Sequence, residues 1–161
     1  MTPIQQSGQI TPFHAAMWAA NGVIADGGAM PTGRVIVSGR SLNFNTVNDQ
    51  PIVFPQWITA FRLANIVVTN ASISLTTAAG GFYPAASKGG TPIVANSQVY
   101  SALTTSAGLM TATIAAFGTG TRFSSANLAE IGGLLAIYFS LTTAQGAAAT
   151  GDIYFIVDNL T

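Results

Sequence analysis

The sequence predicts an all-β protein whose β-sandwich body follows an extended N-terminal arm. From Arg34 onward, short β-branched and apolar runs alternate with turn residues, at the spacing of about ten residues that is typical of a sandwich. Charged residues make up 6% of the chain, against roughly 25% in an ordinary domain. The first residues are polar and proline-containing and show no regular helical pattern. We therefore expect an arm over residues 1–34 and a body over residues 35–161.

The composition excludes two classes and favours assembly. Hydrophobic residues make up 49% of the 161 residues, too many for a disordered chain. The longest apolar run, residues 131–139, is far shorter than the roughly 20 residues that span a bilayer as a helix. Because the formal net charge is zero, a free monomer would risk self-association. We expect an oligomer with no membrane partner, and the N-terminus shows no secretory pattern.

The arm contains a hairpin signal and the predicted interface. Asn21-Gly22 separates two short apolar runs, which is the strongest local signal for a two-residue type I′ hairpin. Trp18 lies beside this turn with little local structure to bury it, so docking on a neighbouring subunit and packing on its own body are comparable expectations. The predicted interface residues are the apolar ones of the arm: Ile10, Pro12, Phe13, Met17, Trp18, Val23 and Ile24.

The body is expected to consist of short strands. The candidate strands are residues 35–37, 42–47, 52–58, 66–76, 109–115, 134–142 and 152–157, the last of them deep in a sheet. Pro55 interrupts one strand and indicates an edge or a bulge. Residues 93–103 fit helix and strand equally. A turn is predicted at Gly80-Gly81, because glycine turns without steric cost.

Two further local patterns carry predictions. Ser124 and Ser125 are suitable N-caps, Leu128 and Ile131 lie three apart, and Gly132 is a suitable C-terminal residue, so one short helix is predicted over residues 124–133. The pentapeptide at residues 74–78 recurs at residues 140–144. We interpret the repeat as two equivalent strand-to-loop corners.

No catalytic, cofactor or metal site is predicted. His14 is the sole histidine and cysteine is absent, so neither a histidine-based triad nor a thiolate site is expected. Arg62 lies beside apolar residues, and a buried guanidinium needs a carboxylate, for which Asp49 and Glu130 are the candidates. The five basic residues are spread over the chain and indicate no nucleic-acid partner.

Three blocks resemble small structural proteins of tailed-bacteriophage virions: TNASISLTTAAGGFYPAASKGG at residues 69–90, QVYSAL at residues 98–103, and IYFSLTTAQGAAATGDIYFIVD at residues 137–158. The segment QSGQITPFHAAMWAANGVIADGG at residues 6–28 is similar to one near the start of phage head-fibre and tail-associated proteins. Those proteins usually have glycine where Phe13 stands.

The resemblance implies a jelly-roll-like β-sandwich body. Together with the arm and the short helix predicted from the residues, the expected fold is an all-β, jelly-roll-like β-sandwich with an extended N-terminal arm and one short helix. It also implies a homo-oligomeric capsid decoration (cement) protein, a dimer or trimer on the outer capsid surface, with the major capsid protein as partner. The alternatives are a head-fibre or tail-associated subunit and a carbohydrate-binding adhesin. No enzyme is expected.

Overall fold

The computed structural model describes residues 5–6, 14–19, 23–29, 33–104, 106–114 and 121–160. The chain forms two compact units, Met1–Thr32 and Gly33–Thr161. Their boundary lies two residues before the end of the predicted arm.

The N-terminal unit is a small three-stranded sheet in the order β1-β3-β2. Its strands are β1 (Gln5–Gln6), β2 (His14–Ala19) and β3 (Val23–Ala29). Strands β2 and β3 pair antiparallel, with Ala19 opposite Val23 at the closed end. The predicted hairpin is thus present as a strand pair, while the Asn21-Gly22 turn lies outside the described residues.

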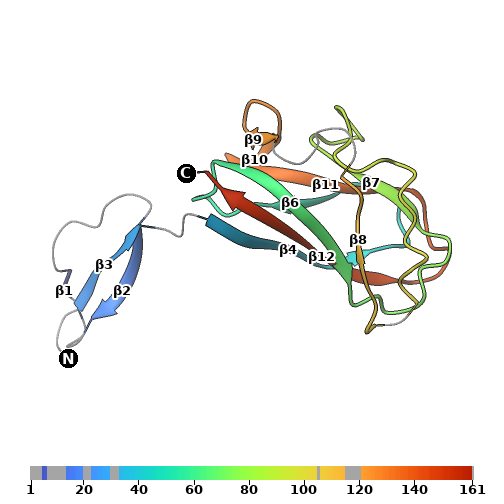
Figure 1. Ribbon diagram of the computed structural model, residues 1–161, viewed down its shortest axis with the longest axis horizontal. Helices are drawn as coiled ribbons and strands as arrows, with labels where there is room; N and C mark the ends of the chain where they lie inside the picture. The colour runs from blue at the N-terminus through green and yellow to red at the C-terminus, as the bar shows by residue number, and fades with distance from the viewer. Residues whose placement is uncertain are drawn as a thin grey trace. The chain divides into compact units, whose positions relative to one another are not determined.

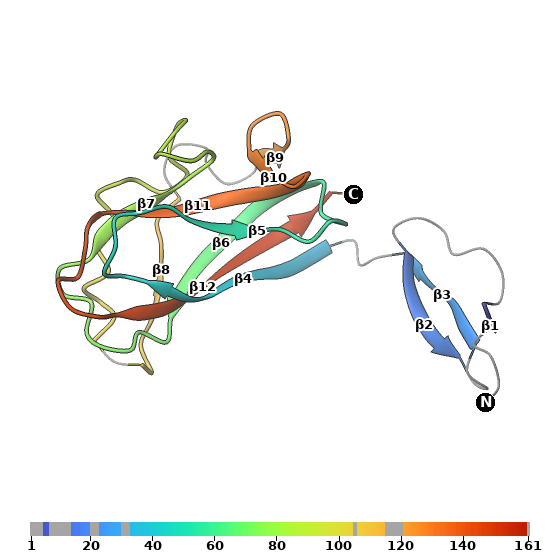
Figure 2. The ribbon, with the colours of Figure 1, turned by 180° about the vertical axis from the view of Figure 1, so that it is seen from behind.

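The body consists of two antiparallel sheets, which Figures 1 and 2 show as two layers. The larger sheet has the order β4-β12-β6-β8, and β9 also pairs with β6. The smaller has the order β10-β11-β5, and β7 also pairs with β11. The strands are β4 (Gly33–Asn43), β5 (Gln50–Val53), β6 (Ala60–Thr69), β7 (Ala79–Tyr83), β8 (Leu109–Thr111), β9 (Arg122–Ser124), β10 (Ala129–Ile131), β11 (Leu134–Thr143) and β12 (Thr150–Asn159). The predicted all-β class and the two-sheet architecture are confirmed.

Strand β12 lies between β4 and β6. Its alternation sends Ile153, Phe155 and Val157 into the core, where all three are fully buried, and places Tyr154 and Ile156 on the outer face, partly exposed. Alternate residues of a strand face opposite sides of its sheet. The prediction that the last strand lies deep in the sheet is therefore correct.

Aromatic rings from both sheets fill the core. Phe54 stacks on Phe61 with ring centroids 4.5 Å apart, and Phe61 in turn stacks on Phe123 at 5.4 Å. Phe82 meets Phe155 edge to face at 5.4 Å across the two sheets. Each such pair contributes about 0.5–1.5 kcal/mol beyond the area it buries. The sandwich is thus held together by ring packing in place of charged contacts.

The predicted turn at Gly80-Gly81 is wrong, because both glycines lie within β7. A Cβ built on Gly80 would lie 2.3 Å from the Leu141 Cα, and one on Gly81 would lie 2.2 Å from the Val94 carbonyl oxygen. These glycines let neighbouring backbones approach closely, a second use of glycine in strands.

The predicted helix over residues 124–133 is also wrong. Ser124 ends β9, a single turn follows in which its carbonyl accepts from the Leu128 N–H at 2.9 Å, and the chain then enters β10. Gly132 and Gly133 have φ values of +60° and +79° and join β10 to β11 as a two-residue turn closed by Ile131 and Leu134. Positive φ at both positions is the requirement of a type I′ hairpin, so this glycine pair connects strands.

Several strand boundaries differ from the predicted ones. Residues 44–49, 54–59 and 70–78 are loops, and residues 93–103 contain only turns and isolated bridges. In contrast, β4 is longer than predicted and begins at Gly33. Strand β6 begins at Ala60, before the predicted start at residue 66, and ends at Thr69. The two pentapeptide repeats are not equivalent corners, because residues 140–143 belong to β11 while residues 74–78 form a loop.

Candidate functional site

A row of charged side chains crosses the outer face of the larger sheet. Arg34 on β4 lies opposite Asp158 on β12, Asp158 lies opposite Arg62 on β6, and Arg62 lies opposite Arg122 on β9. The three arginines are exposed. With strands roughly 4.8 Å apart, the row is roughly 15 Å long. Three of the five basic residues of the chain therefore lie in one row.

Asp158 is the single carboxylate in this row and is bound to one end of it. The Arg34 Nε donates to the Asp158 Oδ1 at 3.1 Å, and the two side chains are 66% and 42% exposed. An ion pair this exposed contributes about 0–1 kcal/mol. With three arginines and one aspartate, the row has a formal charge of +2.

The core imposes the pairing of Arg62 with Arg122. Directly beneath them, Phe61 and Phe123 are also paired in register and stack inside the sandwich. Because a strand alternates its faces, burying the two rings forces the next residue of β6 and the preceding residue of β9 to the outside together. Like charges directly opposite one another destabilise a sheet. The sheet thus places two arginines directly opposite one another, an arrangement that is electrostatically unfavourable.

An aliphatic row lies beside the charged one. Ile36 on β4 is 63% exposed and lies opposite the partly exposed Ile156 on β12. Asn65 on β6 continues this row. Exposed apolar side chains next to charged ones are typical of protein-interaction surfaces. We call these two rows together the arginine face: Arg34, Ile36, Arg62, Arg122, Ile156 and Asp158.

The carboxylate at the opposite end of β12 is structural. Asp152 accepts from the Asn70 side-chain amide and from the Ser41 backbone N–H, both at 2.8 Å, and Arg40 lies 3.9 Å away. The hydrogen bond from Asn70, then that from Ser41 and the Arg40 charge, hold the pKa of Asp152 below its usual value, although burial opposes them. Ser41 and Asn70 both have positive φ, so Asp152 stabilises left-handed backbone conformations near the ends of β4 and β6.

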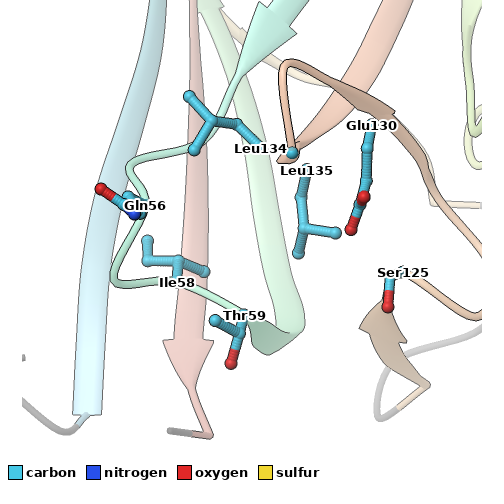
Figure 3. A pocket seen from close by; sticks show the side chains of 8 residues that line it. Gln56, Ile58, Thr59, Ser125, Glu130, Leu134 and Leu135 are labelled. Carbon is cyan, nitrogen blue, oxygen red and sulfur yellow. The ribbon is translucent and has the colours of Figure 1, made fainter.

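A pocket of about 220 Å³ lies where β10 and β11 meet the loop before β6. Figure 3 shows the Glu130 carboxylate beside the Leu135 side chain, with Ser125 below it and the Ser125 hydroxyl directed away from Glu130. The lining residues are Gln56, Ile58, Thr59, Ser125, Glu130, Gly133, Leu134 and Leu135. The pocket thus has a polar, exposed rim over buried aliphatic side chains.

The structure corrects the expectation for Arg62. Its side chain is exposed between the buried Phe61 and Leu63, so it requires no buried ion pair. The carboxylate opposite it is Asp158, which was not among the predicted partners. Asp49 instead accepts a hydrogen bond from the Ser87 N–H, and Glu130 lines the pocket.

The predicted interface residues are only partly described. Ile10, Pro12 and Phe13 lie outside the described residues, whereas Met17 and Trp18 belong to β2 and Val23 and Ile24 to β3. In register, Trp18 lies opposite Ile24 and Ala19 opposite Val23. His14 begins β2.

The sequence reasoning missed the other members of the arginine face. Local alternation was a usable signal, since Arg62 and Arg122 each adjoin an apolar residue that faces the core. No sequence signal indicated that β6 and β9 pair in this register.

The described part of the chain lacks both a metal-binding cluster and a helix that could span a membrane. It contains no group of three histidine, cysteine, aspartate or glutamate residues able to hold a metal ion. It also contains no helix that is long and apolar enough to cross a membrane.

Comparisons with protein-family models, curated proteins and solved structures find no significant match for this chain.

Proposed function

We propose that the chain is a structural protein of a tailed-bacteriophage virion, a homo-oligomeric capsid decoration (cement) protein that binds the major capsid protein on the outer surface of the head. The observation that carries this proposal is the division into an N-terminal hairpin unit and a sandwich body. One unit for attachment and one for coverage suit a subunit that is added to a lattice. The chain performs no catalysis in this role.

Composition and core support the same role. The 6% content of charged residues leaves a surface of small neutral side chains that tolerate close packing against other chains. The body has its own aromatic core, so it stays folded when the N-terminal unit binds the capsid. A jelly-roll arrangement of the strands, as the resemblance implies, belongs to this proposal.

Deleting residues 1–32 tests the proposal. The remaining body retains its complete core, so it is expected to fold and to give the circular dichroism of a β-protein. It should no longer co-sediment with purified capsids that bind the full chain. Trp18→Ala should weaken co-sedimentation, whereas the control Gln5→Ala should not. Full capsid binding by the truncated chain would refute the role of the N-terminal unit.

Copy number separates decoration from the first alternative, a head-fibre or tail-associated subunit. A cement protein covers the lattice and follows the number of capsid subunits. A fibre or tail protein is confined to a vertex. Quantitative mass spectrometry of virions distinguishes the two, and labelled antibody shows where the copies lie.

The pocket favours one candidate from another class, a carbohydrate-binding adhesin. Its volume of about 220 Å³ is below the roughly 300–1,000 Å³ of sites for drug-sized ligands and suits a single sugar ring. A carboxylate and a hydroxyl pair with sugar hydroxyls, and the aliphatic floor suits the C–H faces. Glycan binding that is lost in Glu130→Gln, but kept in the control Asp49→Asn, would support the adhesin.

A further inference from the structure

We propose that the arginine face docks an acidic surface of a protein other than this chain, with carboxylates against Arg62 and Arg122 and apolar side chains against Ile36 and Ile156. This second contact surface goes beyond the proposed function, because its residues belong to the body, whereas the proposed attachment uses residues 1–32.

The charge of the row carries the first step. Three arginines and one aspartate give the row a formal charge of +2, and the core stack beneath keeps Arg62 and Arg122 opposite each other. Guanidinium groups bind carboxylates in a bidentate manner. An acidic partner removes the like-charge repulsion that the sheet tolerates while the face is free. The face is therefore complementary to carboxylates spaced along a flat strip.

The same charge argues against a second copy as the occupant. Two arginine faces packed together would bring two rows of +2 into contact, and like charges across an interface cost several kcal/mol. The other three carboxylates of the body offer no acidic strip. Asp152 is bound by Ser41 and Asn70, Asp49 is bound by Ser87, and Glu130 is a single carboxylate on β10 of the smaller sheet.

The aliphatic row argues for a protein in place of a nucleic acid. Phosphate contacts would use the arginines but leave Ile36, which is 63% exposed, without a complementary group. A protein surface with apolar side chains beside its carboxylates satisfies both rows.

The test uses the full chain, labelled with ¹⁵N, and a hexaglutamate peptide as the carboxylate probe. Titration should shift the Nε–Hε signals of Arg62 and Arg122, and added salt should weaken the binding. In the double variant Arg62→Gln/Arg122→Gln, the affinity should fall by about tenfold or more. The control Lys88→Gln removes a positive charge from the loop that follows β7 and should leave the affinity unchanged.

Thermal denaturation separates a docking role from a structural one. Because Arg62 and Arg122 repel one another, the double variant should have an unchanged or higher Tm. The proposal is overturned if millimolar peptide shifts neither arginine, if Lys88→Gln weakens binding equally, or if the Tm of the double variant falls. Tighter binding of a short DNA duplex than of the peptide would also overturn it. None of these measurements involves capsids, so they succeed or fail independently of the proposed attachment by residues 1–32.

Discussion

Replacing Asp152 by asparagine removes the charge that fastens the ends of β4 and β6 to β12. Each Asp152 oxygen accepts one short hydrogen bond, Oδ1 from the Ser41 N–H and Oδ2 from the Asn70 amide. Asparagine keeps a single acceptor oxygen, so one of the two bonds is lost. A hydrogen bond to a charged group contributes about 1.5–3 kcal/mol. We expect Asp152→Asn to lower the free energy of unfolding by that amount.

The matched control is Asp158→Asn on the same strand. Asp158 is 42% exposed, whereas the Asp152 side chain is 12% exposed. Loss of the exposed pair with Arg34 should cost about 0–1 kcal/mol. Urea denaturation of residues 33–161 measures both variants, because Trp57, one of two tryptophans in the chain, packs against the core and is then the sole tryptophan reporter.

The same pair of variants has a defined pH dependence. Since the pKa of Asp152 is lowered in the folded state, its stabilisation is complete above the unfolded pKa of about 3.9. It is lost as the pH falls through the lower folded pKa. The difference between wild type and Asp152→Asn should therefore be constant at neutral pH and narrow below about pH 4. The reasoning is refuted if Asp152→Asn has the wild-type urea midpoint, or if Asp158→Asn costs as much.

Substitutions at three further positions test the body. Gly81→Ala puts a methyl group 2.2 Å from the Val94 carbonyl oxygen and should cost about 3 kcal/mol or more, and an unchanged Tm would contradict the close approach. Gly132 has a φ of +60°, so Gly132→Val should lower the free energy of unfolding by about 1–3 kcal/mol. Gly132→Asn should lower it much less, because asparagine tolerates positive φ. Equal urea midpoints for the two variants would argue against the type I′ turn. Phe123→Ala removes a fully buried ring from its stack on Phe61. Urea denaturation should show a loss of about 3–5 kcal/mol in the free energy of unfolding. A loss below about 1 kcal/mol would show that the stack does not contribute to the core.

The wrong helix and the wrong turn have one physical cause. A serine cap, a spacing of three residues between Leu128 and Ile131, and a following glycine describe a helix end, but they also describe a turn followed by a glycine hairpin. Only the pairing of β10 with β11 distinguishes the two. Likewise, Gly80-Gly81 fits a turn until the Leu141 backbone is placed beside it.

Local patterns were sufficient where the signal was short-range. An apolar run bounded by turn residues is a property of consecutive residues, so it predicted β11 and β12 and the deep position of residues 153–157. The Asn21-Gly22 signal predicted the pairing of β2 with β3 for the same reason.

By itself, the sequence determined the all-β class, the apolar strands β11 and β12, the pairing of β2 with β3 and the neutral character of the surface. Those properties depend on residue type and near neighbours. The tertiary structure alone decided which charges meet. Arg34, Arg62 and Arg122 are far apart in the chain, and they form one row because β4, β12, β6 and β9 pair in the register imposed by buried rings such as Phe61 and Phe123.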